Sequence, residues 1–473
     1  MKLNKKKLEN YFKKNSKKFL VIDSDGKKTT YSDFYKKSLY VIFYLKKLGI
    51  KKNTKIIILS DNSLNYLITL NACLLGGYTA CPLDPSIKKE RLIAIKKIYK
   101  KSFIIKDVSK IRFKKLFLKE GLIDYQNTQC LILYGSNEKG EPKGIVLSSD
   151  SIIKSSISFS KLANYDSDSR ILHCLPMFYM GGILDTFFAC ICSGSTILLD
   201  KRFSIMNILN FWKLPLKMKC NVLFLTPSIV AFLTLIFRKP SLKIKKHVSK
   251  YKSIIATGDY LYPETRKKFY DIFNKKIFSC YGATELGGPV AIQKKNHTSE
   301  NFCVGSHAQE IKIIAKNTIN KQKTIYIKSP YLMDGYLTKN GIEKIKEIKG
   351  YFDTGDTGKY SKGLLFISGR KRNIIKKGGE LIYLDLIEKI TLNILNVDEA
   401  AAIGKKDEIA GEEIYLFVRI LKKNLSNKKL NDIRKILTMK LRPIEVPKKI
   451  ISIQKIPKNK NGEKDIKKLL EMI

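Results

Sequence analysis

A glycine-containing loop after a short apolar stretch has the composition of a site for a phosphorylated ligand. The apolar residues Gln129–Tyr134 predict a strand, and residues 135–144 after it read Gly-Ser-Asn-Glu-Lys-Gly-Glu-Pro-Lys-Gly. Glycines in a turn after a strand let backbone N–H groups approach a triphosphate, and Lys143 adds a cation. An ordinary surface turn rich in lysine and glycine is the alternative interpretation.

Three further segments place hydroxyl, carboxylate and guanidinium groups downstream of this loop. They are Tyr281-Gly282-Ala283-Thr284-Glu285, Tyr351-Phe352-Asp353-Thr354-Gly355-Asp356 and Gly369-Arg370. The Thr284 hydroxyl can bond a phosphate or a carboxylate. Glu285 can hold Mg²⁺, a hard cation that proteins bind through one or two carboxylates plus phosphates. A carboxylate such as Asp356 can accept two hydrogen bonds from a ribose diol. A plain turn or a surface charge is the alternative for each segment alone.

Together, in this order and at these separations, the four segments resemble the adenylate-forming superfamily, whose main members are acyl-CoA and aryl-CoA synthetases. The resemblance runs from Thr30-Tyr31 through Pro82-Leu83-Asp84-Pro85 to Lys464. It implies an α/β fold, with a large multi-subdomain N-terminal domain that contains parallel sheets and a small mobile α+β C-terminal domain. The implied reaction uses ATP and Mg²⁺ to convert a carboxylic acid into an acyl-adenylate, followed by thioester formation. We expect CoA as the acceptor because no carrier domain follows.

The resemblance assigns nucleotide-binding roles to five residues. Tyr281 matches the residue that offers a ring face to adenine, and Gly282 the glycine that lets the backbone approach the ligand. Gly258 matches a glycine beside the adenine, although a plain strand-end turn is an equal alternative there. Asp356 matches the acid that binds the ribose diol, and Arg370 a fixed cation near the ribose and phosphate.

Catalysis is assigned to Thr284, Glu285 and Lys143. The resemblance implies that Thr284 bonds the α-phosphate or the substrate carboxylate, that Glu285 is the Mg²⁺ ligand and that Lys143 contacts the triphosphate. In-line attack of a carboxylate on the α-phosphorus needs neutralisation of charge more than it needs a proton-transfer residue. Cations and hydrogen-bond donors are therefore the expected catalytic groups.

The segment Leu175–Gly182 is similar to a family segment that lies beside the acyl pocket. Tyr179 takes the place of a histidine there, so that an aromatic wall with a polar tip is retained, and Gly287 is the second expected pocket residue. An apolar turn in the core is the alternative. Relatives that activate amino acids hold the ammonium group with an Asp in this pocket. The nearest acid here, Asp185, lies outside the matched segment, which disfavours an amino acid as substrate.

The chain departs from the family pattern in two places. In the phosphate loop, Asn137 replaces a glycine, and Glu138 and Lys139 replace hydroxyl residues that would donate hydrogen bonds to phosphate. Near the C-terminus, Glu463 occupies the position of a catalytic lysine, and Lys464 follows one residue late. These departures support an alternative function, a degenerate non-adenylating binder of nucleotide or acyl-AMP. A ligase that loads an acyl carrier protein is a further alternative.

The length of 473 residues suggests two or three domains. We expect an AMP-binding N-terminal domain over residues 1–369 and a mobile C-terminal domain over residues 370–473. The resemblance makes Arg372 the hinge between them, whereas one more surface base is the alternative in so basic a chain.

The formal charge of +48 comes from 90 Lys and Arg against 42 Asp and Glu. Nucleic acid or an anionic membrane is one possible partner for such a chain. Lysine far outnumbers arginine, however, and is spread along the whole chain. An AT-rich genome would produce such lysine enrichment at the exposed positions of any protein. No segment has the signature of a nucleic-acid-binding module. We therefore expect no nucleic acid partner, and strongly salt-dependent DNA binding would be needed to restore that function.

The nine cysteines form no CxxC pair and mostly lie inside apolar runs, as buried thiols do. We therefore expect a reducing compartment, no disulfide framework and no structural zinc. Residues 1–18 lack the apolar core of a secretory signal. The longest apolar stretch, Gly181–Leu199, contains an acid, glycines and serines, and it predicts a buried helix, turn and strand. A cytoplasmic protein with no integral membrane segment is expected.

The first part of the chain alternates predicted helices and strands, which favours parallel sheets covered by helices. The pattern predicts helices over Tyr31–Leu48 and Asn62–Leu75 and strands over Lys55–Leu59 and Thr79–Leu83. From Ile311 onwards, short strands joined by turns rich in glycine and lysine predict a smaller β-rich unit.

Overall fold

The computed structural model divides the chain into two compact units. The larger comprises Met1–Gly135, Gly140–Lys312 and Lys328–Glu347, and the smaller Ser136–Lys139, Ile313–Ile327 and Ile348–Ile473. The structure describes residues 2–87, 89–99, 101–108, 111, 113, 121–126, 129–134, 142–261, 263–297, 302–317, 323–345, 347–370, 374–377, 380–407, 411–421, 427–441, 443–458 and 464–473. The domain boundary expected between residues 369 and 370 stays a prediction.

The first sheet of the larger unit has a parallel centre. Its neighbouring strands are, in spatial order, β2 (Lys28–Thr30), β1 (Phe19–Asp23), β9 (Thr196–Leu199), β8 (Arg170–His173), β10 (Val222–Leu225), β11 (Ser253–Ala256), β12 (Phe278–Ala283), β13 (Gly288–Ile292) and β14 (Cys303–His307). Strands β1, β9, β8, β10, β11 and β12 run parallel. Strands β13 and β14 extend this sheet antiparallel. The central strands are continuous apolar runs because both of their faces are covered.

A second sheet lies in the same unit. Its strands are, in spatial order, β18 (Gly341–Glu343), β17 (Gly335–Thr338), β7 (Gly144–Ser148), β6 (Gln129–Tyr134), β4 (Thr79–Pro82), β3 (Lys55–Ile58) and β5 (Ser102–Ile105). Strands β6, β4, β3 and β5 are parallel, and β7 returns antiparallel beside β6. Ile57, Cys81, Ile132 and Val146 of these strands share one apolar cluster with Ile95 of a covering helix.

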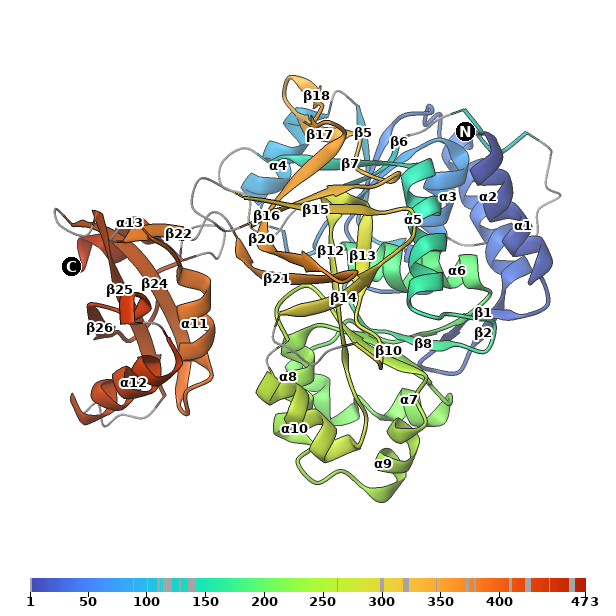
Figure 1. The fold of residues 1–473 in the computed structure, drawn as a ribbon. Helices are drawn as coiled ribbons and strands as arrows, with labels where there is room; N and C mark the ends of the chain where they lie inside the picture. Colours follow the sequence, from blue (N-terminus) through green and yellow to red (C-terminus); the bar gives the residue numbers. More distant parts are fainter. Residues whose placement is uncertain are drawn as a thin grey trace. The chain divides into compact units, whose positions relative to one another are not determined.

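Helices cover both sheets. They are α1 (Lys2–Lys14), α2 (Tyr31–Lys47), α3 (Leu64–Gly76), α4 (Lys89–Ile98), α5 (Ser149–Leu162), the π-helix η2 (Gly181–Phe188), α6 (Ala189–Ser193), the 3-10 helix η3 (Ile205–Asn210), α7 (Lys213–Lys217), α8 (Pro227–Ile236), α9 (Leu242–Ser249) and α10 (Pro263–Phe273). Figure 1 shows α1 and α2 side by side, and α8, α9 and α10 grouped at the end of the unit below β10. The alternation of helix and strand expected from the sequence is confirmed.

Local capping explains where two of the predicted helices begin and end. The side chain of Thr30 accepts a hydrogen bond from the backbone N–H of Asp33 and starts α2. Ser63 starts α3 in the same way, through the N–H of Tyr66. Gly77 ends α3 with φ 79°, a left-handed conformation that glycine adopts without strain.

The apolar stretch Gly181–Leu199 forms η2, α6, a turn at Gly194 with φ 75° and then β9. This confirms the helix, turn and strand expected there. In the part of the chain that the structure describes, no helix is long and apolar enough to cross a membrane.

The smaller unit begins with the strands β15 (Lys312–Asn317), β16 (Lys323–Lys328), β20 (Tyr351–Ser361) and β21 (Leu364–Arg370), with β19 (Glu347–Ile348) beside β20. Its second sheet has the order β23 (Glu380–Tyr383), β22 (Ile374–Lys377), β25 (Gly411–Ile420) and β24 (Val397–Asp407), and β26 (Lys449–Ser452) also pairs with β25. Its helices are α11 (Leu384–Leu392), α12 (Asn427–Lys440), the 3-10 helix η6 (Pro443–Glu445) and α13 (Ile466–Glu471). The β-rich texture expected after Ile311 is confirmed.

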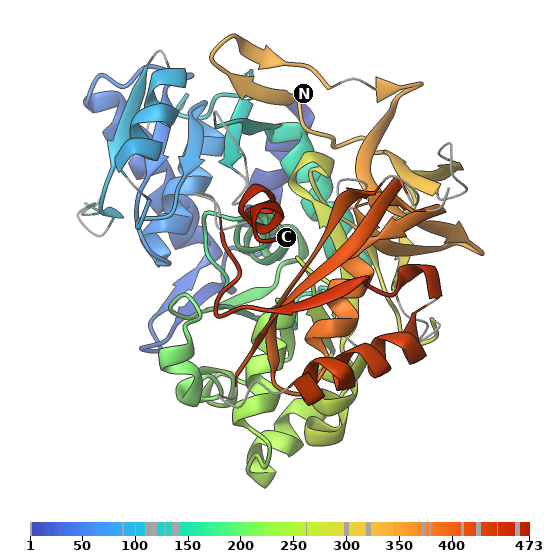
Figure 2. The ribbon, with the colours of Figure 1, turned by 90° about the vertical axis from the view of Figure 1, so that its left-hand side faces the viewer.

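The alternation of side chains along β25 gives this second sheet two covered faces. Leu416 points into a cluster that contains Ile387 of α11 and Ile433 of α12. Its neighbour Phe417 points to the other face, where Leu469 of α13 packs. Figure 2 shows the long strands β24 and β25 with α12 along one side and α13 on the other.

Candidate active site

The candidate residues of the larger unit lie at the carboxyl ends of parallel strands. Thr226 follows β10, Gly258 follows β11, and Thr284 follows β12. Ligands of open α/β sheets bind at this edge because the loops of several strands converge there. The sequence prediction that Gly258 and Thr284 belong to one site therefore agrees with the order of the strands.

Strand pairing and one hydrogen bond tie the segment of Gly258 to the segment of Tyr281. Ala256 of β11 is the parallel partner of Ser279 of β12. One residue later, the Thr257 hydroxyl donates a hydrogen bond of 3.2 Å to the carbonyl oxygen of Cys280. Gly258 and Tyr281 are the residues that follow this contact in the two segments. Gly258 has φ 91° and is exposed, and a Cβ there would meet only Cγ2 of Thr226 at 4.0 Å, so its backbone is accessible from solvent.

Gly282 is fixed by the neighbouring strand. It pairs with Pro289 after an irregularity in the register between Tyr281 and Gly282. A Cβ on Gly282 would lie 2.5 Å from the Cα of Pro289 and 2.6 Å from the carbonyl oxygen of Gly288. The close approach that requires glycine here is therefore to β13. The approach to a ligand that the sequence suggested stays a prediction.

Thr284 begins a single 3-10 turn, η4 (Thr284–Leu286), which ends at Gly287. Gly287 has φ 76°, and its N–H donates to the carbonyl oxygen of Thr284 at 3.0 Å. A Cβ on Gly287 would lie 1.9 Å from the carbonyl oxygen of Tyr331. Backbone conformation and packing thus both demand glycine, and the turn holds the half-buried Thr284 and Glu285 just beyond the sheet edge.

The Glu285 carboxylate is oriented by a residue that the sequence interpretation missed. The hydroxyl of Tyr336, in β17, donates a hydrogen bond of 3.3 Å to Oε1 of Glu285. The backbone N–H of Met333 donates to the carbonyl oxygen of Glu285 at 3.0 Å. No sequence pattern signals these contacts, because about fifty residues and a change of sheet separate the two segments.

Glu285 offers one oriented carboxylate to a cation. No group of three acidic, histidine or cysteine side chains gathers into a metal site among the residues described. A hard cation such as Mg²⁺ can be held by one or two protein carboxylates together with phosphate and water oxygens, so Glu285 as a magnesium ligand stays a prediction.

Lys143 closes the hairpin between β6 and β7. Tyr134 and Gly144 are cross-strand partners, and Lys143 directly precedes the second strand. Lys143 is exposed and Pro142 is buried. A Cβ on Gly144 would lie 2.5 Å from Cγ2 of Ile132, which explains a glycine there. Three residues of the loop that depart from the family pattern, Asn137, Glu138 and Lys139, lie outside the described part of the chain.

The segment that carries Tyr179 is held by the side chain of Asn62, which lies between β3 of the second sheet and α3. Nδ2 of Asn62 donates to the carbonyl oxygen of Leu175 at 2.8 Å, and Oδ1 accepts from the N–H of Met177 at 3.1 Å. The Tyr179 side chain is 40% exposed, and its ring centre lies 4.7 Å from that of Phe178. Asn62 was expected only as the start of a helix, and its bridging role was missed.

Asp185 lies on the π-helix η2 with its carboxyl group fully buried. Neither carboxyl oxygen has a hydrogen-bond partner in the structure, and burial raises the pKa of Asp185 well above its ordinary value. Burial without a partner favours the neutral form of such a carboxyl. The expectation that the substrate is not an amino acid stays a prediction.

Asp356 is the best-buried candidate of the smaller unit. It lies in β20 and is 5% exposed, and its backbone N–H donates to the Thr354 hydroxyl oxygen at 3.1 Å. That hydroxyl donates to the carbonyl oxygen of Ile325 at 2.7 Å, so the turn is tied to β16. Asp356 is the cross-strand partner of Arg370. The Arg370 side chain and the whole of Arg372 lie outside the described residues.

Lys464 has a partner within the smaller unit. Its Nζ forms an ion pair with Oε1 of Glu388 in α11 and lies 3.4 Å from the carbonyl oxygen of Ala402. Burial raises the pKa of Glu388, and the charge of Lys464 opposes that rise. Glu463 lies outside the described part of the chain. The structure thus gives Lys464 a structural contact that the sequence could not reveal.

Two family models match this chain. The model for AMP-binding enzymes matches residues 8–337, and the model for the C-terminal domain of AMP-binding enzymes matches residues 386–463. The chain belongs to the AMP-binding enzyme family, as the resemblance of its motifs indicated.

Curated relatives are CoA ligases of low sequence identity. Indoleacetate–CoA ligase from Aromatoleum aromaticum is 24% identical over 71% of this chain and 66% of its own length. Sulfoacetate–CoA ligase from Cupriavidus necator is 27% identical over 61% of this chain, which spans only 57% of that protein. 2-Succinylbenzoate–CoA ligase from Bacillus cereus is 23% identical over 95% of both chains.

Solved structures share the fold along nearly the whole chain. o-Succinylbenzoate CoA synthetase from Bacillus subtilis, in complex with its acyl-adenylate intermediate, superposes with a TM-score of 0.82 at 20% identity. The superposition covers 97% of this chain and 96% of that one. ATP-bound MatB from Rhodopseudomonas palustris gives a TM-score of 0.80 at 18% identity over 98% of each chain. The predicted fold, a large α/β domain with a smaller α+β domain, is confirmed.

Proposed function

We propose that this protein is an AMP-forming acid–thiol ligase. It converts a carboxylic acid and ATP into an acyl-adenylate and pyrophosphate, and then transfers the acyl group to CoA with release of AMP. The observation that supports the proposal is the hydrogen bond from the Thr257 hydroxyl to the carbonyl oxygen of Cys280, which ties the segment of Gly258 to the segment that leads to Thr284. CoA ligases among the relatives support the same reaction.

The nucleotide is proposed to bind at the carboxyl ends of β11 and β12. The exposed backbone at Gly258 and the ring of Tyr281 offer an edge and a face to adenine. In the smaller unit, the Asp356 carboxylate supplies acceptors for the two ribose hydroxyls, and Arg370 supplies a fixed positive charge. Gly282 keeps β12 close to β13, so that Tyr281 holds its position.

Charge neutralisation is the proposed chemistry at the α-phosphate. Thr284 donates a hydrogen bond to the α-phosphate or to the attacking carboxylate, and exposed Lys143 approaches the triphosphate. Glu285, oriented by Tyr336, is the proposed ligand for Mg²⁺, which supplies Lewis-acid charge stabilisation when it is bound. No side chain has to move a proton, because the attacking carboxylate is already ionised.

The acid is proposed to bind between Tyr179 and the turn that ends at Gly287. The named acids of the relatives range from sulfoacetate to long-chain fatty acids, so family membership alone does not select a substrate. CoA is the proposed acceptor, a carrier protein is the alternative, and Arg372 is the proposed hinge at the start of the domain 370–473. A cytoplasmic location is supported by nine cysteines that are all buried free thiols.

A second candidate is a binder of nucleotide or acyl-AMP that does not adenylate. The observation that favours it is the ion pair between Lys464 and Glu388. Relatives carry their catalytic lysine at the position of Glu463, and Lys464 is the lysine next to that position. Its ion pair with Glu388 competes with any contact to a substrate. A chain in this state would retain Thr284, Glu285 and Asp356 for binding but lack the lysine that bridges carboxylate and phosphate.

Mass spectrometry of reaction products tests the acceptor. The protein is incubated with ATP, Mg²⁺ and a panel of fatty, aryl and short acids, with CoA or with a phosphopantetheinylated carrier protein. We expect AMP and an acyl-CoA in equal amounts. Acylated carrier without acyl-CoA would overturn the choice of CoA. AMP in neither reaction would favour the binder.

A further inference from the structure

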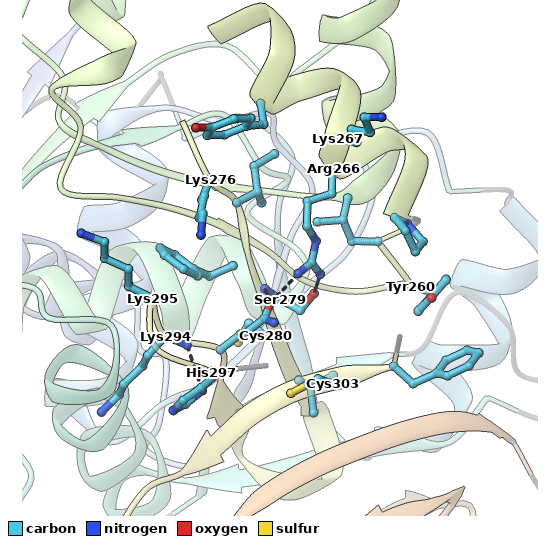
Figure 3. Close-up of a pocket in the computed structure, with 18 of the residues that line it drawn as sticks. Tyr260, Arg266, Lys267, Lys276, Ser279, Cys280, Lys294, Lys295, His297 and Cys303 are labelled. Carbon is cyan, nitrogen blue, oxygen red and sulfur yellow. Dashed lines mark hydrogen bonds between the residues drawn. The ribbon is translucent and has the colours of Figure 1, made fainter. Parts of the chain in front are cut away.

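The larger unit contains a cavity of about 310 Å³ that the proposed chemistry does not use. Helix α10, the first half of β12 and the described residues after β13 and at the start of β14 form its walls (Figure 3). The described lining includes Ser279 and Cys280 but neither Thr284 nor Glu285. Its volume is at the lower end of the range for small-molecule pockets.

Arg266 of α10 lines this cavity, and its hydrogen-bond acceptors among the described residues carry no charge. Its Nη1 donates to Oε1 of Gln293 at 2.7 Å, and its Nη2 donates to the hydroxyl of Ser279 at 2.7 Å. Both acceptors are neutral. Nε is buried without a hydrogen-bond partner, and burial lowers the pKa of Arg266. A guanidinium has five N–H donors, and two of those of Arg266 have acceptors among the described residues. A half-buried cation whose described acceptors are neutral is costly, and a bound anion would relieve that cost.

The charges around the cavity favour an anion as well. Its described lining contains the lysines Lys267, Lys276, Lys294 and Lys295 and a single acid, Asp259. Burial and the nearby charge of Lys294 lower the pKa of His297, so this imidazole is neutral at pH 7. Figure 3 shows Arg266 turned toward Ser279 in the interior, with Lys294 and Lys295 on the opposite wall.

The remaining walls are flat and apolar. The rings of Tyr260 and Phe302 stack with centres 5.0 Å apart and planes at 28°. Burial raises the pKa of Tyr260 to about 12, so its hydroxyl adds no negative charge at neutral pH. Leu261, Phe278 and Val304 complete an apolar lining. A ring system fits such walls better than a flexible polar molecule does, because ring faces bury area at little entropic cost.

We propose that this cavity is a second ligand site, which binds a small aromatic anion with its carboxylate or phosphate on Arg266 and its ring against Tyr260 and Phe302. A planar carboxylate matches the fork of guanidinium N–H groups, and a phosphate offers the same acceptors. The site lies on β12 just before Tyr281, so its ligand contacts the strand that carries the proposed nucleotide residues. Binding at this second site requires neither ATP nor a substrate acid, so it can be tested independently of the ligase activity.

Calorimetry with three probes on one ring system tests the site. 2-Naphthoate and 2-naphthyl phosphate carry the two anionic groups, and 2-naphthamide is the neutral analogue. We expect both anions to bind the wild-type protein at least tenfold more tightly than the amide, and the more tightly bound anion identifies the natural head group. Equal affinity for anions and amide would overturn the proposal, and this comparison needs no variant.

Variants then assign the binding to Arg266. Arg266→Gln keeps a polar group near Ser279 but removes the charge, and we expect at least a tenfold loss of naphthoate affinity. Lys268→Gln is the matched control, because Lys268 is exposed on the same helix and does not line the cavity. Thr284→Val must leave naphthoate binding unchanged. Loss in Thr284→Val with retention in Arg266→Gln would place the probe in the proposed acid site and overturn the inference.

A brominated probe locates the ligand directly. Crystals of the protein with 6-bromo-2-naphthoate should give an anomalous bromine peak in the cavity between α10 and β12. A peak only near Tyr179 or Thr284, or no peak in the cavity, would contradict the assignment.

Discussion

At the scale of single residues, the buried carboxyl of Asp185 is a costly feature. Among the described residues neither of its oxygens has a hydrogen-bond partner, and burial raises its pKa well above the ordinary value. Such a group survives in a fold only as the neutral acid. Its presence on a π-helix next to the proposed acid pocket agrees with the frequent occurrence of π-helices at functional sites.

Asp185 makes a predictable contribution to the pH dependence of stability. The folded pKa is raised, so below the unfolded pKa of about 3.9 both states hold the proton. Above that pH, only the unfolded state releases the proton. The unfolding free energy therefore falls by about 1.4 kcal/mol per pH unit until the pH reaches the pKa of Asp185 in the folded state. We therefore expect Asp185→Asn to gain stability relative to wild type as the pH rises from 5 to 8. Urea unfolding at both pH values measures this, and a difference independent of pH would show that Asp185 is not held neutral.

The ion pair between Lys464 and Glu388 is expected to matter for stability. Lys464→Ala leaves a poorly solvated carboxyl at Glu388, and we expect a loss of ~3 kcal/mol in unfolding free energy. Lys467→Ala, an exposed lysine at the start of α13, is the control and should unfold like wild type. Equal stability of the two variants would mean that Lys464 is free in solution and available for catalysis.

At the scale of elements, the hairpin of β12 and β13 supports the proposed site. Gly282→Ala would place a methyl group against the backbone of β13, whereas Gly258→Ala meets open space and only an unfavourable φ. We expect Gly282→Ala to lower the unfolding free energy by about 2 kcal/mol, and Gly258→Ala by about 1 kcal/mol. Denaturant titration compares them. If Gly258→Ala is the more damaging change, the packing at Gly282 described above is wrong.

What the sequence could predict was mostly local. Strand β6 was predicted to the residue, because an apolar run between polar turns marks a strand covered on both faces. The start of α2 followed from the hydroxyl of Thr30. The segment of Tyr281 to Glu285 was recognised from its motif, and the strand that leads into it lies beside the strand that leads to Gly258.

The contacts that the sequence did not reveal join distant segments. Asn62 bridges Leu175 and Met177, and Tyr336 bonds Glu285, across separations of fifty residues or more. Such pairs depend on how two sheets pack, and no local propensity or spacing encodes that. Arg266 was missed for the same reason, because one arginine in a basic chain has no special signature until its burial and neutral partners are known.

At the scale of the whole molecule, the charge of +48 has a testable meaning. If lysine enrichment is general surface composition, duplex DNA should bind only through weak, salt-sensitive attraction. We expect a dissociation constant weaker than ~1 µM for a labelled 20-base-pair duplex at physiological salt. Fluorescence anisotropy measures it. Tighter, sequence-dependent binding would restore nucleic acid as a partner.

The central claim is that this AMP-binding enzyme family member adenylates a carboxylic acid, and carboxylate-dependent ATP–pyrophosphate exchange tests it most directly. The exchange is measured with a panel of fatty, aryl and short acids. We expect exchange with at least one acid class, and a loss of about a hundredfold in Thr284→Val. The same exchange should be abolished in Asp356→Ala and largely retained in Lys464→Ala. No exchange with any acid, together with tight binding of ATP or AMP, would contradict the claim and favour the non-adenylating binder.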